Sequence, residues 1–113
     1  MFRTFALVAA LVALPSTVLA DVLPDEVGDA GRIQTLHINH LYADTYLQFH
    51  GRVFIGKDAD EYRWGGASCG TKVLPDNMVS LLESALDSGL NVEPLWKPGQ
   101  GGAKCLVGFN IGS

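Results

Sequence analysis

The sequence has few residues of the kinds that build metal or redox centres. It contains two cysteines, no C-x-x-C spacing and three histidines, all in the first half of the chain. On a strand, His37 and His40 would point to opposite faces, and no cysteine or carboxylate completes a metal site with them or with His50. We therefore expect solvent-facing histidines, no metal and no other cofactor.

A long apolar run is also missing. Residues 1–20 have Arg3 near the start, an apolar stretch over 5–14 and a small-residue end, the pattern of a cleaved secretory signal peptide. The apolar stretch is shorter than the about 20 residues that a membrane-spanning helix needs. We expect export to the periplasm or to the outside of the cell, with no membrane span.

The mature chain would carry few positive charges. Loss of Arg3 leaves seven basic side chains against twelve acidic ones, a net charge of −5 compared with −4 for the whole sequence. An acidic domain of this size argues against a nucleic-acid partner and against adhesion to anionic lipid. The 93 residues that follow the signal suffice for one domain with one modest core.

A covalent link matters for a core this small. Cys69 and Cys105 are the only cysteines of a chain routed to an oxidising compartment, so one disulfide between them is expected. In the chain-entropy model a closed loop of this length contributes roughly 3 to 4 kcal/mol. The alternative is a free or metal-binding pair.

The segment 75–90 has the clearest helical pattern. Asp76 after Pro75 is a good N-cap, and Gly89 is a good C′ residue. At about 100° per residue the apolar and polar side chains separate into two arcs, so we expect one three-turn amphipathic helix on the core. The apolar arc contains Met78, Val79, Leu81, Leu82, Ala85 and Leu86, and the polar arc Asn77, Ser80, Glu83, Ser84, Asp87 and Ser88.

The remaining sequence shows the two-residue alternation of β-strands. Residues 21–31, rich in acidic residues, proline and glycine, are expected to form an irregular N-terminal arm. Gly51 falls at an inward position, where it predicts a bulge or a sharp bend. The order β-β-β-α-β-β suits a small OB-like barrel over residues 32–113, mainly β with one helix and one disulfide. Strands are expected over residues 33–39, 46–55, 61–69, 91–96 and 103–111.

Residues 66–70 match the G-x-S-x-G pattern of serine hydrolases, with Ser68 in the nucleophile position. The pattern has catalytic meaning on a strand-to-helix turn of a large parallel sheet, with a histidine later in the chain. No histidine follows Ser68, and the chain is too short for such a sheet. A glycine-rich strand that brings a half-cystine to its partner is the preferred interpretation, and a small hydrolase using Ser68 is a remote alternative.

Aromatic residues form a second candidate site. Tyr62 and Trp64 lie on one face of a strand, with Arg63 between them, and Tyr46 and Trp96 lie near turns. An aromatic ring can stack on a sugar or a protein surface while its polar tip stays hydrated, so these five residues are candidate ligand contacts. Half of the aromatic rings could equally belong to the core.

The order of several segments resembles a known family. The run 33–38, the Asp44-Thr45-Tyr46 turn, the half-cystine before the helix and the helix ending in Ser88-Gly89 are similar to the receptor-binding (B) subunits of AB5 toxins. The pertussis-like, typhoid and subtilase cytotoxin groups are the most similar. The resemblance covers residues 33–92 and extends loosely to the end of the chain. It implies an OB-fold, a ring of five subunits and glycan recognition on the outer surface of the barrel.

In such a ring the polar helix face would line a central pore. That face includes Ser80, Glu83, Ser84 and Asp87, and five acidic helices would repel one another unless a basic partner segment lay between them. The family holds its glycan with a Tyr-Tyr-Ser type stretch, whereas residues 27–31 read Val-Gly-Asp-Ala-Gly here. No glycan-binding residue therefore transfers by match.

The sequence thus predicts an exported, non-catalytic binding module for a glycan or a protein, similar to toxin B subunits. The alternative is a monomeric periplasmic protein that inhibits or stabilises a protein partner. Oligomeric state separates the two hypotheses, because a ring requires edge strands of neighbouring copies to pair.

Overall fold

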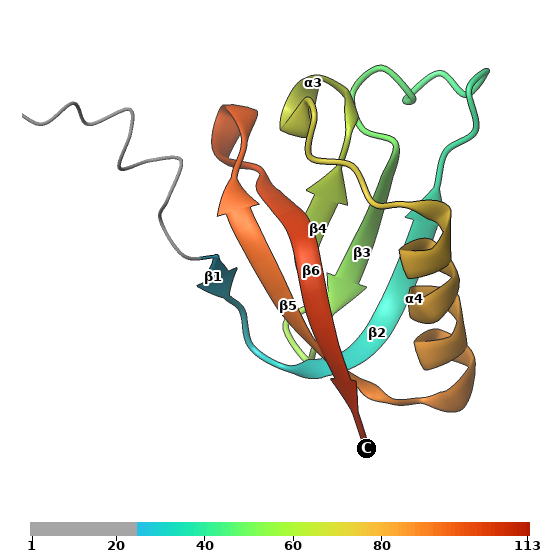
Figure 1. Ribbon diagram of the computed structural model, residues 1–113, viewed down its shortest axis with the longest axis vertical. Helices are drawn as coiled ribbons and strands as arrows, with labels where there is room; N and C mark the ends of the chain where they lie inside the picture. The colour runs from blue at the N-terminus through green and yellow to red at the C-terminus, as the bar shows by residue number, and fades with distance from the viewer. Residues whose placement is uncertain (1–24) are drawn as a thin grey trace, which may run out of the picture.

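The computed structural model describes residues 25–113 (Figure 1). The predicted signal peptide and the first residues of the predicted arm, 21–24, lie outside the described residues. Within residues 25–113 no helix is long and apolar enough to cross a membrane. The described elements are β1 (Glu26–Val27), β2 (Gly31–Ile38), β3 (Gly51–Ile55), β4 (Asp60–Trp64), α3 (Gly66–Cys69), α4 (Asp76–Ser88), β5 (Asn91–Pro98), η1 (Gln100–Gly102) and β6 (Lys104–Gly112).

Five of these strands close into a barrel. The order in the sheet is β1-β5-β2-β3-β4-β6, and a further pairing of β5 with β6 joins its two sides. β4 and β6 are parallel, while the other pairs are antiparallel. The predicted fold class, a mainly β OB-like barrel with one main helix after its third strand, is confirmed.

The part of the predicted arm that the structure describes lies alongside β5. Glu26 and Val27 pair with β5, and the backbone N–H of Gly28 donates to the carbonyl of Pro94 at 2.9 Å. β2 continues along β5 at Gly31 and Arg32 and then pairs with β3. The chain from Glu26 to the end of β2 therefore passes from β5 to β3.

The core fills the barrel with inward side chains from β3, β4 and β5. Burying one large aliphatic or aromatic side chain contributes about 1.5 to 3 kcal/mol. Trp64 lies opposite Gly51 in the β3–β4 pair, and a Cβ at Gly51 would collide with the indole ring. The ladder is regular at Gly51, so the predicted bulge there is wrong: the glycine makes room for a ring. The buried core cluster contains Ile33, Val53, Ile55, Tyr62, Trp64, Leu74, Leu82, Ala85, Val92 and Leu106.

Helix α4 packs beside β2 and ends as predicted (Figure 1). Gly89 adopts the left-handed conformation with φ 65°, and the N–H groups of Gly89 and Leu90 donate to the carbonyls of Leu86 and Ala85 at 3.4 and 3.0 Å. This is a Schellman motif, which satisfies the last carbonyls of the helix. The N-cap is Pro75, one residue before the predicted Asp76, and no side chain caps it.

The apolar arc of α4 is only partly buried. Leu82 and Ala85 are in the core and Met78 and Val79 pack against it, whereas Leu81 is 51% and Leu86 38% exposed. The contact stripe is narrower than the predicted arc, because the helix lies on the barrel along the line of Leu82 and Ala85. The predicted polar face, with Ser80, Glu83, Ser84 and Asp87, is exposed.

Two predicted strands are shorter than expected. Residues 41–48 form turns although a strand was predicted from residue 46, and Leu47 in this turn is 80% exposed. The third strand ends at Trp64, and residues 66–69 form α3. Backbone N–H groups of Ala67 and Ser68 donate to the carbonyls of Leu47 and Gln48 at 2.7 and 3.0 Å, so contacts between α3 and the loop replace ladder bonds.

Candidate functional site

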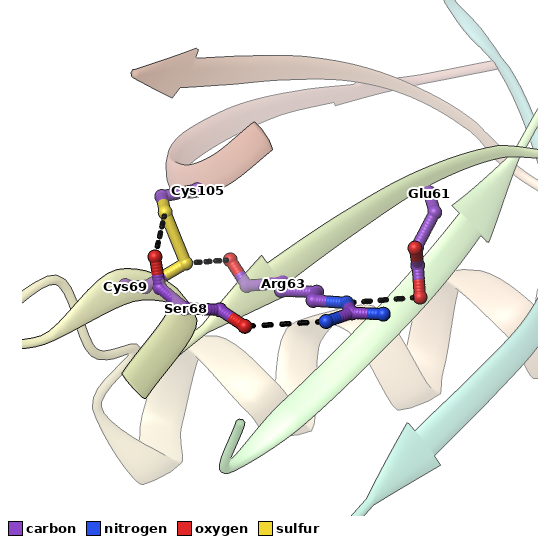
Figure 2. The surroundings of a disulfide bond; sticks show 5 residues. All are labelled: Glu61, Arg63, Ser68, Cys69 and Cys105. Carbon is purple, nitrogen blue, oxygen red and sulfur yellow. Dashed lines mark hydrogen bonds and ion pairs between the residues drawn. A yellow bond between two sulfur atoms is a disulfide. The ribbon is translucent and has the colours of Figure 1, made fainter. Parts of the chain in front are cut away.

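The predicted disulfide between Cys69 and Cys105 is present and joins α3 to β6 (Figure 2). Both cysteines are buried. Cys69 Sγ lies 3.4 Å from the carbonyl oxygen of Arg63, and Cys105 Sγ lies 3.6 Å from that of Ser68. A disulfide sulfur carries no hydrogen, so these are close contacts that pack the bridge against β4 and α3.

The outward face of β4 carries Arg63 beside this bridge. Its Nε donates to Glu61 Oε2 at 3.1 Å and its Nη1 donates to Ser68 Oγ at 3.2 Å, as Figure 2 shows. The guanidinium carbon lies 4.8 Å from the centre of the Phe49 ring. Two hydrogen bonds and one aromatic face therefore fix the position of this cation.

Glu61 binds a second arginine as well. Arg52 Nη1 donates to the same Oε2 atom at 2.9 Å, and the Arg52 guanidinium lies 5.1 Å from the rings of Phe49 and Phe54. Partial burial alone would raise the pKa of Glu61, but hydrogen bonds from Arg52 and Arg63 and their charges lower that pKa below its ordinary value. One carboxylate for two guanidinium groups leaves this face with a net positive charge.

Two adjoining pockets open beside Arg63. The Arg63 pocket has a volume of about 330 Å³ and the Lys72 pocket one of about 380 Å³. They share Ala67, Ser68 and Gln100, so α3 and η1 form the boundary between them. Gln48, Arg63, Ala67, Ser68, Gln100 and Gly101 line the Arg63 pocket. Ala67, Ser68, Cys69, Gly70, Thr71, Lys72, Pro98, Gly99 and Gln100 line the Lys72 pocket.

Three parts of the barrel bring these residues together. OB-folds bind oligonucleotides and oligosaccharides on the face of their second and third strands and with the loops between strands one and two and between strands four and five. Here those strands are β3 and β4, and those loops are residues 39–50 and 99–103. The Arg63 pocket has one residue from β4, Gln48 from the first loop and Gln100 from the second, so it lies where OB-folds bind.

Ser68 is not arranged as a nucleophile. A serine nucleophile needs a neighbouring base that takes its proton. Ser68 Oγ instead accepts a hydrogen bond from Arg63, and in residues 25–113 no histidine or carboxylate is hydrogen-bonded to it. The arrangement gives no support to the hydrolase alternative.

Most of the predicted aromatic site is not on the surface. Tyr62 and Trp64 are 1% and 3% exposed, so they are core residues and the prediction that they contact a ligand is wrong. Strand alternation turns both rings inward and therefore turns Arg63 outward, into the Arg63 pocket. Tyr46 is half-buried and stacks on His50 with 4.3 Å between ring centres, while Trp96 is half-buried with Lys104 5.2 Å away. Neither lines the two pockets.

Each of the three histidines has contacts of its own. His37 packs edge-on against Phe49 with ring centres 5.7 Å apart, and Nδ1 of His40 accepts from the backbone N–H of Tyr42 at 3.1 Å. In the part of the chain that the structure describes, no three His, Cys, Asp or Glu side chains are grouped so that they could hold a metal ion. His40 is exposed, whereas His37 and His50 are half-buried.

The loop 39–50 presents apolar side chains to solvent. Leu41 is 64%, Tyr42 86% and Leu47 80% exposed. Asn39 is buried, and its Nδ2 donates to the carbonyl of Phe49 at 2.9 Å, which ties the two ends of the loop together. Sequence reasoning missed this loop, as it missed Gln48, Lys72 and Gln100. A comparison of the predicted strand order with the binding loops of OB-folds could have pointed to this loop and to the loop that contains Gln100, but not to Lys72, which lies between α3 and α4.

Comparisons with known proteins assign no family. No protein-family model, no curated protein and no solved structure matches the chain. The similarity to toxin B subunits thus rests on the sequence pattern, and the two pockets rest on their own geometry.

Proposed function

We propose that the protein is an exported, non-catalytic binding module that takes an oligosaccharide at the Arg63 and Lys72 pockets. The observation that carries this proposal is the position of the Arg63 pocket between β4, the loop 39–50 and η1, with the Lys72 pocket adjoining it at α3 and η1. The Arg63 pocket thus lies on the surface on which OB-folds bind oligosaccharides.

The chemistry of the pocket walls supports a sugar ligand. Gln48 and Gln100 offer amide donors and acceptors, Ser68 a hydroxyl and Arg63 a guanidinium. A sugar hydroxyl both donates and accepts hydrogen bonds, so its binding site needs donors and acceptors. Pockets for compact small molecules are mostly enclosed, so two open pockets side by side, each with polar side chains in its wall, suit an extended chain better.

Binding without hydrolysis fits the same walls. Glycoside hydrolysis uses a pair of carboxyl groups on either side of the scissile bond. No Asp or Glu is among the residues that line the two pockets, and the carboxylate of nearby Glu61 is bound to two arginines. The predicted signal peptide and the disulfide suit an oxidising compartment outside the cytoplasm.

A glycan array with the processed protein, residues 21–113, tests this function. We expect binding to oligosaccharides that falls about tenfold in Gln48→Ala/Gln100→Ala, since each substitution removes a side-chain hydrogen bond from the pocket. The matched control is Asn77→Ala on the exposed surface of α4, which should bind as the unchanged protein does. Failure to bind any glycan, or equal affinity in all three proteins, would contradict the proposal.

A second candidate function is favoured by the exposed loop 39–50. Exposed apolar side chains that gather on a soluble protein often mark a protein-binding surface, and the tied ends of this loop would limit the ordering cost of such binding. Leu41, Tyr42 and Leu47 would then contact a protein partner. Tyr42→Ser should abolish capture of that partner while leaving glycan binding unchanged.

Oligomeric state separates the toxin-subunit form of the proposal from the monomeric one. Light scattering on the processed protein gives the mass directly. A pentamer would support a ring of the toxin B-subunit type, with the polar face of α4 toward the pore. A monomer would rule out the ring and favour a periplasmic protein that binds one partner.

A further inference from the structure

We propose that the two pockets select an acidic oligosaccharide, with one anionic group at Arg63 and a second at Lys72. The inference rests on the proposed function and goes beyond it by naming the charge and the minimum length of the ligand. The shared chemistry is a carboxylate or a sulfate group on a sugar chain.

Arg63 retains unused donors at the pocket. A guanidinium has five N–H groups, and within residues 25–113 the bonds to Glu61 and Ser68 occupy two of them. Phe49 covers one face of the group, so an incoming ligand meets its remaining N–H edge. A preorganised guanidinium of this kind suits the planar, two-oxygen geometry of a carboxylate or the oxygens of a sulfate.

The local charge favours an anion although the chain as a whole is acidic. Arg52 and Arg63 share the single carboxylate of Glu61, and no acidic residue lines either pocket. Charges farther away than about 8 Å are largely screened at physiological ionic strength. The pockets therefore form a small cationic area on a protein with a formal net charge of −4.

Lys72 supplies the second cation. Its backbone is fixed at the end of β4, because its N–H donates to Cys69 at 3.0 Å and its carbonyl accepts from Gly65 at 2.7 Å. In the described part of the chain its ammonium group takes part in no ion pair, although the side chain is half-buried beside the pocket. Because Lys72 lines the pocket and its charge is unpaired within residues 25–113, its ammonium group is available for a ligand.

The shared boundary sets the length of the ligand. Ser68 and Gln100 belong to both pockets, so a molecule that reaches Arg63 and Lys72 together must cross them. A ligand with one anionic group would satisfy only one pocket. A chain of several sugars with repeated acidic groups satisfies both, with Ser68 and Gln100 contacting its neutral hydroxyls.

Calorimetry with three probes tests the inference: polygalacturonate oligomers, heparin hexasaccharide and neutral maltohexaose. We expect binding to at least one acidic probe and at least tenfold weaker binding to maltohexaose. Arg63→Gln and Lys72→Gln should each weaken acidic-probe binding about tenfold, since each substitution removes a charge-assisted hydrogen bond to an anionic group of the probe. Added salt should weaken binding less in either variant than in the unchanged protein. Carboxylate and sulfate are distinguished by which acidic probe binds.

Lys57→Gln is the matched control, because it removes the same charge at an exposed position in the turn between β3 and β4, outside both pockets. If Arg63→Gln unfolds, Lys72→Gln still decides, because the Lys72 side chain has no hydrogen bond to lose in residues 25–113. Equal losses in Lys57→Gln, or no binding of either acidic probe, would overturn the inference. Binding of maltohexaose as tight as that of the acidic probes would overturn it too, while leaving the proposed function intact.

Discussion

Glu61 is the residue that holds the cationic area in place. Its Oε2 atom accepts from Arg52 and Arg63 and so keeps two like charges close together on one face of the barrel. Without this carboxylate the guanidinium groups would repel each other, and Arg63 would lose one of the contacts that aim it at its pocket. The charge of Glu61 therefore matters for stability and for the geometry of the site.

The pH dependence of stability should report this contact. Burial acts to raise the pKa of Glu61, but hydrogen bonds and charges of Arg52 and Arg63 prevail, so its pKa is lower folded than unfolded. The carboxylate then stabilises the fold above the unfolded pKa of about 4.3, and this contribution is lost as the pH falls through the folded pKa. We expect urea unfolding to give a higher unfolding free energy for the unchanged protein than for Glu61→Gln at about pH 6. This difference should shrink as the pH falls to about 3.

Glu83→Gln provides the comparison for this experiment. Glu83 lies exposed on α4 and takes part in no ion pair within residues 25–113. Its substitution should leave the difference from the unchanged protein nearly constant with pH. A constant difference for Glu61→Gln as well would show that the ion pairs contribute nothing to the pH response.

The sequence contained enough information to place Tyr62 and Trp64 correctly. Glu61 and Arg63 alternate with them, and charged residues on a barrel strand face outward unless they are paired inside. The prediction placed the ligand on the face of the two aromatic rings, which is buried. The same alternation identifies Arg63 as the surface residue. Gln48 and Gln100 could not be identified in this way, because nothing in the neighbouring sequence distinguishes them from any other polar loop residue.

At the scale of elements, local chemistry decided which segments could be predicted. Both ends of α4 were predicted to within one residue, because Pro75 and Gly89 act on their immediate neighbours. Residues 46–50 and α3 were wrongly predicted to be strand, because their structure depends on hydrogen bonds between segments about twenty residues apart, such as that from Ala67 to Leu47. No short window of sequence contains that partnership.

Gly89→Ala tests the importance of the α4 terminus. Gly89 has φ 65°, and a left-handed conformation costs an L-residue roughly 1 to 2 kcal/mol. A Cβ there would meet only the end of Arg32 at 3.8 Å, so the loss would reflect backbone conformation and not a collision. We expect urea unfolding to show a decrease of about 1 kcal/mol in unfolding free energy. Gly112→Ala, in open space on β6, should change little, and equal losses in both would refute the argument.

At the scale of the whole molecule, the barrel and the disulfide determine where the site forms. The strand order and the main helix after the third barrel strand could be predicted because alternation, turns and helix ends agree along the chain. The pockets could not, since they lie where β4, α3, η1 and the loop 39–50 meet, and only the closed barrel brings these parts together. Cys69–Cys105 then ties α3 to β6 beside both pockets.

Removal of the disulfide should therefore affect stability and binding together. The bridge closes a loop with a sequence separation of 36 that contains all of α4, and such a loop contributes roughly 3 to 4 kcal/mol to stability. Cys69→Ala/Cys105→Ala should lower the urea midpoint accordingly and weaken oligosaccharide binding under conditions where the protein is still folded, because α3 loses its anchor. Reductant should bring the unchanged protein to the same midpoint and leave the double variant unaffected. If the folded double variant bound as tightly as the unchanged protein, α3 would be held by its bonds to Leu47 and Gln48 alone, and the bridge would serve only stability.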